Sequence, residues 1–326
     1  MKKVKTAVVG VGSLGRHHLK WLSKLGSSDL VGLFDIDSDR AAEYASEYGV
    51  KSFSSLGELS KSVEAVSIVV PTSAHFEVAS ELIEARIHCL IEKPVTVTVE
   101  QANKLAVAAK DSSVCVSVGH IERFNPAVAA LRNEKMHPSF IEGHRLAAFD
   151  PRGTDVAVVL DLMIHDIDLV LSMVDSEIVD TQASAVAVVS DQADIANARL
   201  TFANGAVANL TASRISLGSM RKLRIFQKSG YFSLDLAAKQ ADIYQLAELG
   251  DASEGMKVPI GKSEKNLLYR KVKDSGEDML KSELDAFLGA VRNKRKVEVT
   301  LEEATEALRV AMRVNEIGLA SIKRML

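Results

Sequence analysis

The sequence of 326 residues contains very little cysteine, only Cys89 and Cys115. Because no Cys-x-x-Cys spacing occurs, the pattern excludes a metal or redox pair of that type. Each cysteine is flanked by apolar residues. We therefore expect both to be reduced residues that are buried in a core.

The chain also lacks a large excess of charge, internal repeats and Pro-rich linkers. Hydrophobic residues make up 47%, charged residues 25%, and the net charge is -3. This balance is typical of a globular protein and argues against disorder and a membrane protein. It gives no broad attraction to nucleic acid or anionic membranes, and we expect the densest basic run, "RNKRK" at 292–296, to be a solvated loop. Lysines rather than an apolar signal segment follow Met1, which favours a cytoplasmic location.

The length predicts two domains, because one core rarely organises so many residues. In the first, short β-branched runs alternate with helical patterns, as in a parallel sheet that is buried on both faces. Capping boxes open helices at Ser55 with Glu58 and at Thr98 with Gln101. We expect residues 1–122 to form a dinucleotide-binding Rossmann domain. The strand candidates are 6–11, 30–35, 65–70, 88–93 and 114–119.

Longer strand candidates follow residue 122 and predict a mostly antiparallel open sheet. "ANGA" at 203–206 suits a type I′ hairpin turn, because Asn204 and Gly205 tolerate positive φ angles. A helix at 156–173 is expected on one face, and two amphipathic helices, 277–292 and 301–323, end the chain. The fold class is thus α/β, with a second α+β domain at 123–326 for substrate binding and oligomerisation. The strand candidates are 139–149, 178–190, 194–203, 205–214 and 221–228.

A glycine-rich loop, "GVGSLG" at 10–15, lies directly after the first strand and opens a helix. Gly10, Gly12 and Gly15 have the G-x-G-x-x-G spacing, which permits a tight turn and close approach of a pyrophosphate to the helix N-terminus. Asp35 ends the second strand, where an acid accepts hydrogen bonds from ribose hydroxyls. This carboxylate would repel a 2′-phosphate, so NAD is favoured over NADP, although Ser38 and Arg40 lie close in sequence.

Two further histidines, His17 and His18, follow the glycine loop on the same helix, where helix packing or exposure is the expected role. After the fourth strand, "IEKPV" at 91–95 places Lys93 at the edge where open α/β sheets bind ligands. The Lys93–Pro94 bond is a candidate for a cis peptide that would fix the lysine in a turn. A solvated strand end is the alternative interpretation.

The stretch "DLMIHDIDLVL" at 161–171 carries four ionisable residues in an apolar helix. At 100° per residue, Asp161, His165 and Asp168 lie within about 60° on one face. Such a stripe is costly to bury and must face a partner, a cavity or a cleft. A metal site, ion pairs with basic residues and a catalytic site are the alternatives. No HExxH-type signal supports the metal, and no role is assigned to Asp166.

Taken together, these motifs resemble the Gfo/Idh/MocA family of NAD(P)-dependent sugar oxidoreductases over nearly the whole chain. The matching segments are "GVGSLG", Asp35, "VPTSAH" at 70–75, "EKP" at 92–94 and the Asp161-x-x-x-His165 helix. The resemblance implies catalytic roles for Lys93, Asp161 and His165. It also implies that the cofactor contacts Gly10, Gly12, Ser13, Leu14, Gly15, Asp35, Pro71, Thr72, His75 and Glu92, although His75 could equally cap the helix that it begins.

Three stretches are similar to the subgroup that contains UDP-N-acetylglucosamine 3-dehydrogenases: 15–18, 119–127 and 155–171. This similarity implies oxidation of the C3 hydroxyl of a UDP-sugar, with Lys93 and His165 dividing proton transfer and alkoxide stabilisation, and Asp161 orienting substrate. Arg123, Asn125 and Arg152 are the candidate substrate ligands, and the two arginines suit a diphosphate, which needs cationic donors. A surface or domain-packing salt bridge is the alternative role for each arginine. Another sugar or cyclitol dehydrogenase and a non-catalytic NAD-binding sensor remain alternatives. Small and apolar residues on both faces of 181–189 predict a homodimer or homotetramer.

Overall fold

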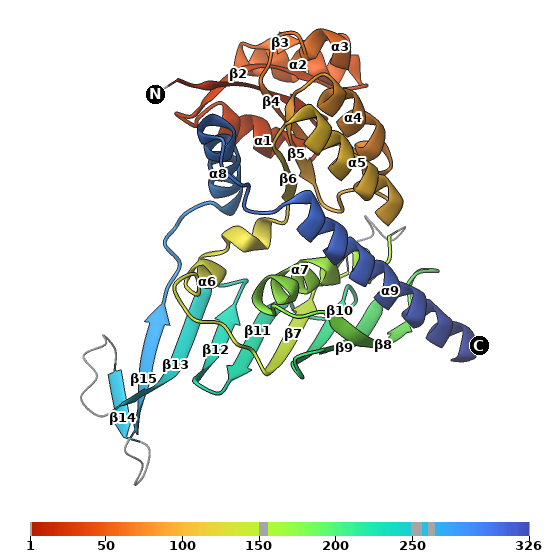
Figure 1. Cartoon of the computed structure of the whole chain (residues 1–326). Coiled ribbons are helices and arrows are strands. Elements are labelled where there is room, and N and C mark those ends of the chain that lie inside the picture. The colour runs from red at the N-terminus through yellow and green to blue at the C-terminus, as the bar shows by residue number, and fades with distance from the viewer. Residues whose placement is uncertain (1, 150–155, 249–255, 260–264, 326) are drawn as a thin grey trace. The chain divides into compact units, whose positions relative to one another are not determined.

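The structure is a computed structural model that describes residues 2–149, 156–248, 256–259 and 265–325. The chain divides into two compact units (Figure 1). Unit 1 consists of Met1–Phe124 and Glu277–Leu308, and unit 2 of Asn125–Gly276 and Arg309–Leu326. The expected domains were 1–122 and 123–326. The structure differs in assigning Glu277–Leu308 to unit 1.

Unit 1 contains a six-stranded parallel sheet with the order β3-β2-β1-β4-β5-β6. Strands β4 and β6 are buried throughout, as their apolar sequences predict. All five predicted strands are confirmed. The sequence did not predict β3, because this edge strand has only two residues and both are exposed. The strands are β1 (Val4–Val9), β2 (Ser28–Phe34), β3 (Lys51–Ser52), β4 (Ala65–Ile68), β5 (His88–Glu92) and β6 (Val116–Gly119).

Helices cover this sheet in two groups, with α4 packed on α5 and α1 packed on α8 (Figure 1). Leu284 and Phe287 of α8 share one apolar cluster with Leu19 of α1. Each such side chain contributes about 1.5–3 kcal/mol when it is fully buried, which explains why α8 belongs to unit 1. The helices are α1 (Gly15–Leu22), α2 (Ser38–Tyr48), α3 (Leu56–Leu59), α4 (Thr72–Glu84), α5 (Val99–Ser112), the 3₁₀ turn η1 (Ile121–Phe124) and α8 (Met279–Asn293).

The predicted helix caps differ in completeness. Thr98 and Gln101 form a full capping box at α5. Thr300 likewise exchanges two hydrogen bonds with Glu303 at the start of α9 (Leu301–Met325). At α3, however, Ser55 accepts the expected bond from the Glu58 N–H, whereas the Glu58 carboxylate binds Ser54. The box at Ser55 is therefore only half formed, because a nearer donor competes for the carboxylate.

Unit 2 contains a nine-stranded sheet with the order β14-β15-β13-β12-β11-β7-β10-β9-β8. Among the described strands of unit 2, only the pairing of β7 with β10 is parallel. Burial alternates along β7, so one face is covered, by η2 and α7, and the other is open (Figure 1). The strands are β7 (Phe140–Leu146), β8 (Ile178–Val186), β9 (Ile195–Phe202), β10 (Val207–Ser213), β11 (Met220–Gln227), β12 (Gly230–Asp235), β13 (Gln240–Glu248), β14 (Met256–Pro259) and β15 (Lys265–Val272).

The helices of unit 2 are α6 (Pro126–Ala129), the π-helical segment η2 (Val159–Met163), α7 (Ile164–Met173) and the later part of α9. The hairpin between β9 and β10 is confirmed, but its turn is not type I′. Only Gly205 has a positive φ, 86°, while the Asn204 side chain accepts the N–H of Ala206. This side-chain bond stabilises a turn that does not need a left-handed asparagine.

The two cysteines agree only in part with the prediction that both are buried. Cys89 is buried as expected, and burial raises the pKa of its thiol. Cys115 is only half-buried, since it immediately precedes the edge strand β6, and both thiols are free.

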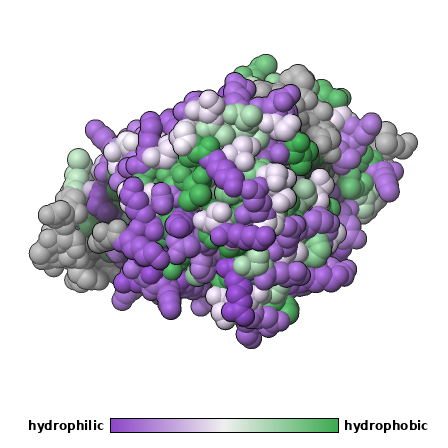
Figure 2. Space-filling view, turned by 90° about the horizontal axis from the view of Figure 1, so that it is seen from above, coloured by the Kyte–Doolittle hydropathy of each residue, from purple (hydrophilic) through white to green (hydrophobic). Residues whose placement is uncertain are grey.

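The face in Figure 2 is mainly hydrophilic, with apolar residues in separate small areas. Among the described helices, none is long and apolar enough to span a membrane.

Candidate active site

A cavity of about 460 Å³ lies in unit 1 at the carboxyl ends of the parallel strands. It extends from Asp35, after β2, to Glu92 and Lys93 at the end of β5. In the sheet order these strands are separated by β1 and β4. An elongated ligand can therefore lie along this edge, where open α/β sheets bind dinucleotides. Of the predicted cofactor residues, all except Gly15 line the cavity: Gly10, Gly12, Ser13, Leu14, Asp35, Pro71, Thr72, His75 and Glu92.

The three glycines of the loop differ in the space around them. Gly10 has a φ of 87°, and a Cβ there would lie 2.5 Å from the carbonyl oxygen of Val69. A Cβ on Gly15 would lie 2.0 Å from the carbonyl oxygen of Gly10, so this glycine permits close packing of α1. Around Gly12 there is open space, with no atom within 4 Å of an added Cβ. The loop therefore leaves room for a pyrophosphate at the N-terminus of α1.

Asp35 has a network of donors on its carboxylate. Its oxygens accept the N–H of Val11 at 2.7 Å and that of Asp37 at 2.9 Å, and Arg40 Nη2 lies 2.8 Å from Oδ1. Burial raises the pKa of Asp35, but hydrogen bonds from Arg40, Asp37 and Val11 lower it more, so the net pKa is lowered. The residue is thus an ionised acceptor at one end of the cavity.

His75 joins the loop after β4 to the turn after β5. Its Nδ1 lies 2.9 Å from the carbonyl oxygen of Pro94, and its Nε2 lies 2.9 Å from that of Val70. The side chain is buried, and burial lowers its pKa despite these contacts. The Lys93–Pro94 peptide is cis, as the sequence suggested. His75 therefore supports the turn that carries Lys93 and is not merely a helix cap.

Glu92 links the cavity to the interior of unit 1. Its side chain is 13% exposed, and its Oε1 lies 3.2 Å from Nε2 of the fully buried His18. The other ring nitrogen of His18 lies 2.6 Å from the Ser67 hydroxyl. This distance to Glu92 suits an ion pair, although the geometry is not that of an aligned hydrogen bond. His18 is therefore a packed interior residue as expected, whereas His17 is exposed.

The polar helix of unit 2 is interrupted by a π-helical segment. Asp161 lies in η2, whereas His165 lies in the first turn of α7. Both side chains are half-buried, but Asp168 is only 1% exposed. The expected stripe thus does not continue as an accessible face to Asp168. A regular 100° rotation does not apply through a π-helical turn, which explains the difference.

Asp166, which had no assigned role, pairs with Arg145 of β7. Arg145 Nε lies 3.1 Å and 3.0 Å from the two carboxylate oxygens, and Nη2 lies 2.7 Å from Oδ1. Both side chains are 3% exposed. This bidentate pair ties α7 to the sheet beneath it. In the part of the chain that the structure describes, no group of three or more His, Cys, Asp and Glu residues could hold a metal ion.

The candidate substrate residues have different environments. Asn125 is fully buried and caps α6 by accepting the N–H of Ala127, while its amide donates to the carbonyl oxygen of Leu236. These contacts indicate a structural role within unit 2. Arg123 is half-buried in η1 of unit 1, and Arg152 lies outside the described residues.

The nucleotide cavity of unit 1 is also lined by Val70 and Val78, which the sequence did not predict, because an apolar residue there has the pattern of an ordinary core residue.

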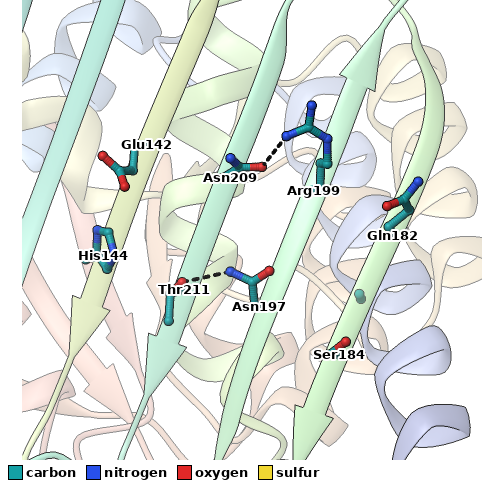
Figure 3. A pocket seen from close by; sticks show the side chains of 9 residues that line it. Glu142, His144, Gln182, Ser184, Asn197, Arg199, Asn209 and Thr211 are labelled. Carbon is teal, nitrogen blue, oxygen red and sulfur yellow. Dashed lines mark hydrogen bonds between the residues drawn. The ribbon is translucent and has the colours of Figure 1, made fainter.

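A second, open cavity lies on the uncovered face of the unit 2 sheet (Figure 3). Arg199 donates to Asn209 at 3.1 Å and Asn197 donates to Thr211 at 2.9 Å, so these side chains on β9 and β10 bond to each other. His144 of β7 lies beside them (Figure 3). Such mutually bonded groups on a flat sheet form a polar surface rather than an enclosed ligand site.

The parallel sheet, the glycine loop and the cavity with Asp35 and Lys93 define a dinucleotide-binding oxidoreductase with a second, sheet-containing domain. Residues 4–120 match the model of "Oxidoreductase family, NAD-binding Rossmann fold", and residues 132–233 match that of the "GFO/IDH/MocA C-terminal domain". The chain belongs to the Gfo/Idh/MocA family of NAD(P)-dependent oxidoreductases.

Similar proteins include several sugar and cyclitol dehydrogenases. UDP-N-acetylglucosamine 3-dehydrogenase of Acidithiobacillus ferrooxidans is 40% identical over 298 residues, which cover 91% of each chain. A solved structure of that enzyme has a TM-score of 0.89 and 37% identity, covering 99% of this chain and 100% of the other. The scyllo-inositol 2-dehydrogenase (NAD(+)) of Bacillus subtilis is 27% identical over 66% of this chain and 68% of its own.

Proposed function

We propose that this protein is an NAD-dependent dehydrogenase that oxidises the C3 hydroxyl of UDP-N-acetylglucosamine to a 3-keto nucleotide sugar, with the cytoplasm as its place of action. The main support is the placement of Asp35 and Lys93 in one cavity at the edge of the parallel sheet. The substrate follows from the 40% identity to an enzyme with that printed activity over most of both chains. It agrees with the resemblance of the stretch at 155–171 to the same subgroup.

The residues present fit NAD. Open space around Gly12 leaves room for the pyrophosphate, and the ionised carboxylate of Asp35 can accept hydrogen bonds from ribose hydroxyls. The same negative charge disfavours a 2′-phosphate. Arg40 does not offset this effect, because its guanidinium is already paired with Asp35. We therefore assign NAD as the preferred cofactor.

NAD, when bound, supplies the acceptor for the hydride that leaves the sugar carbon. The chain must then remove the hydroxyl proton and stabilise negative charge on the oxygen. We assign the proton transfer to Lys93, which lines the cavity on the turn that His75 supports. His165 is assigned to the developing alkoxide and Asp161 to substrate orientation, as the family resemblance implies. Arg123 and Arg152 remain candidates for the diphosphate.

The test is to incubate the purified protein with NAD and a panel of UDP-sugars, free sugars and cyclitols while following NADH absorbance. We expect a signal with UDP-N-acetylglucosamine. A signal only with a free sugar or a cyclitol would replace the proposed substrate by another of the same family. Binding of NAD without turnover of any substrate would support a sensor instead.

Lys93→Met should abolish turnover while NAD affinity stays close to that of the native protein, because the methionine keeps the length of the side chain but cannot transfer a proton. Calorimetry measures the affinity and absorbance the turnover. A matched control is Lys104→Met, which changes a lysine on the exposed side of α5. Full activity of Lys93→Met would contradict the assignment.

The assembly that we propose is a homodimer or homotetramer through the open face of the unit 2 sheet. An aromatic ladder crosses this face, with ring centroids 4.6–5.9 Å apart along Phe140, Phe226, Tyr231, Tyr244 and Tyr269. Aromatic side chains are enriched in interfaces between proteins. Light scattering should give a mass that is two or four times that of one chain, and Tyr231→Glu should lower it; a monomeric native protein would contradict the proposal.

A further inference from the structure

A buried carboxyl group in unit 1 has no role in the site described so far. Glu283 lies on the apolar face of α8, between Leu280, Leu284 and Phe287 in helical spacing, and it is 2% exposed. Within the described ranges, neither of its carboxyl oxygens has a hydrogen-bond partner. Burying an ionised carboxylate without donors is very costly, so this side chain is stable there as the neutral acid.

The charge that acts on Glu283 comes from Glu92, whose proximity raises the pKa of Glu283 in addition to the larger effect of burial. The environment of Glu92 differs from that of Glu283, because Glu92 lines the nucleotide cavity and lies beside His18. Its Oε2 also accepts the N–H of Lys93 at 3.3 Å. Glu92 therefore accepts a hydrogen bond from the Lys93 N–H and lies near the His18 ring, whereas the carboxyl of Glu283 has no hydrogen-bond donor among the described residues. Strand β5 and helix α8 contribute to one apolar cluster, which contains Leu90, two residues before Glu92, together with Leu280 and Leu284 on either side of Glu283. Of two carboxyls that interact, the one with fewer donors keeps the proton.

Other elements enclose the pair. Gly119 of β6 makes room for Glu92, because a Cβ at that position would lie 3.0 Å from its carboxyl atoms. His18 comes from α1 and is held by Ser67 of β4. Other ionisable groups on elements next to the pair include Lys93 after β5, His120 after β6, and Glu122 and Arg123 in η1, which packs on α8. Helix α1 also carries Arg16, His17 and Lys20, and α8 carries Lys281, Asp285 and Arg292.

We propose that Glu92 and Glu283 hold one dissociable proton between them, and that Glu283 is a positioning residue that sets the charge at the Lys93 end of the nucleotide cavity. This proposal rests on the assignment of NAD above. The oxidised nicotinamide ring is a cation and the reduced ring is neutral. A cation beside Glu92 favours the state in which both carboxyls are ionised. Binding of NAD⁺ therefore releases a fraction of a proton to the buffer, and binding of NADH releases a smaller fraction.

The experiment measures proton release on binding, without any sugar. NAD⁺ and NADH are titrated by calorimetry into the native protein in buffers of different ionisation enthalpy, between about pH 5 and pH 9, the range over which buried glutamic acids titrate. We expect a fraction of a proton to be released per NAD⁺ bound. The ratio of NAD⁺ to NADH affinity should rise with pH, by at most about tenfold per pH unit for one proton.

Glu283→Gln keeps the shape of the neutral acid but cannot ionise. We therefore expect it to release equal amounts of proton on binding NAD⁺ and NADH, and its ratio of NAD⁺ to NADH affinity to be independent of pH. Glu302→Gln, which changes an exposed acid in the first turn of α9, should behave as the native protein. An infrared band of a protonated carboxyl should be present in the native protein and absent only in Glu283→Gln.

Three results would overturn the proposal: equal proton release in Glu283→Gln, no release in the native protein, or no protonated carboxyl band. The outcome also separates this proposal from the assigned reaction. Failure of every variant to bind either nucleotide would overturn the cofactor assignment and this inference with it. Proton-linked binding of NAD⁺ without oxidation of any UDP-sugar would overturn the proposed substrate and leave the carboxyl pair supported.

Discussion

At the scale of single residues, the pairing of Asp35 with Arg40 governs the choice of dinucleotide. Asp35→Ser removes the carboxylate that repels a 2′-phosphate and releases the Arg40 guanidinium from its 2.8 Å contact with Oδ1, while the more exposed contact with Asp37 at 3.4 Å stays. We expect affinity for NADP to rise and that for NAD to fall by about tenfold or more each, because one charged hydrogen bond contributes about 1.5–3 kcal/mol. Binding titrations with both nucleotides measure the change.

The double variant Asp35→Ser with Arg40→Ala is the control for this prediction. It lacks both the repelling carboxylate and the guanidinium, so it should lose NAD affinity without gaining NADP affinity. If the double variant gains as much NADP affinity as Asp35→Ser alone, Arg40 is not the ligand of the 2′-phosphate.

Single residues were predictable from sequence where their chemistry depends on local spacing. The glycines, Asp35 and Lys93 each follow a strand of the parallel sheet, so strand order alone brings them to one edge. Glu283 lies about 190 residues beyond Glu92, and only the packing of α8 on unit 1 reveals their coupling. A sequence signal did exist, since Glu283 occupies an apolar position of α8 between Leu280 and Leu284.

At the scale of elements, a buried ion pair connects α7 to its sheet. Asp166→Asn removes the negative charge that Arg145 binds in a site where both side chains are 3% exposed. We expect a loss of about 1.5–3 kcal/mol in the free energy of unfolding, the usual contribution of a hydrogen bond between charged groups. Denaturant titration followed by circular dichroism measures it.

The matched control for this ion pair is Arg224→Gln, which breaks a pair with Glu142 on the open face of the same sheet. Because both of those side chains are about one-third exposed or more, the loss should be below about 1 kcal/mol. A similar loss in the two variants would show that burial does not strengthen the dependence on Arg145.

Elements were predictable where periodicity is strong. The five buried strands of unit 1 and helices α8 and α9 follow from apolar patterns within a few residues. The π-helical turn η2, which packs on β10 and buries Val159 and Met163, has no such pattern in the sequence. Strands β12–β15 were not predicted, since open-face positions such as Tyr231 and Tyr269 are polar or aromatic and weaken the apolar pattern of a strand.

At the scale of the whole molecule, hydrogen bonds on the open face of the unit 2 sheet affect the charge of its side chains. The Tyr269 hydroxyl donates to Asp242 at 2.7 Å, and this bond raises the pKa of Tyr269 to about 12. The tyrosine thus stays neutral throughout the ordinary pH range. The aromatic ladder therefore adds no charge to a face that is otherwise rich in paired ions, which suits contact with a second copy of the chain.

The stability of the chain should depend on pH through Glu283. Its folded-state pKa is raised above the ordinary 4.5, chiefly by burial, so the folded protein retains this proton to a higher pH than the unfolded chain. The contribution of the neutral acid is fully present below the unfolded pKa and is lost as pH rises through the folded one. Glu283→Gln cannot ionise and escapes this loss.

We therefore expect native protein and Glu283→Gln to have similar melting temperatures in mild acid, with the variant becoming the more stable as pH rises. The difference in unfolding free energy should grow by at most about 1.4 kcal/mol per pH unit and then level off above the folded pKa. Calorimetric melting at several pH values measures this difference, and groups common to both proteins cancel in it. A constant difference at all pH values would mean that the pKa of Glu283 is the same in the folded and unfolded states, and would contradict the prediction.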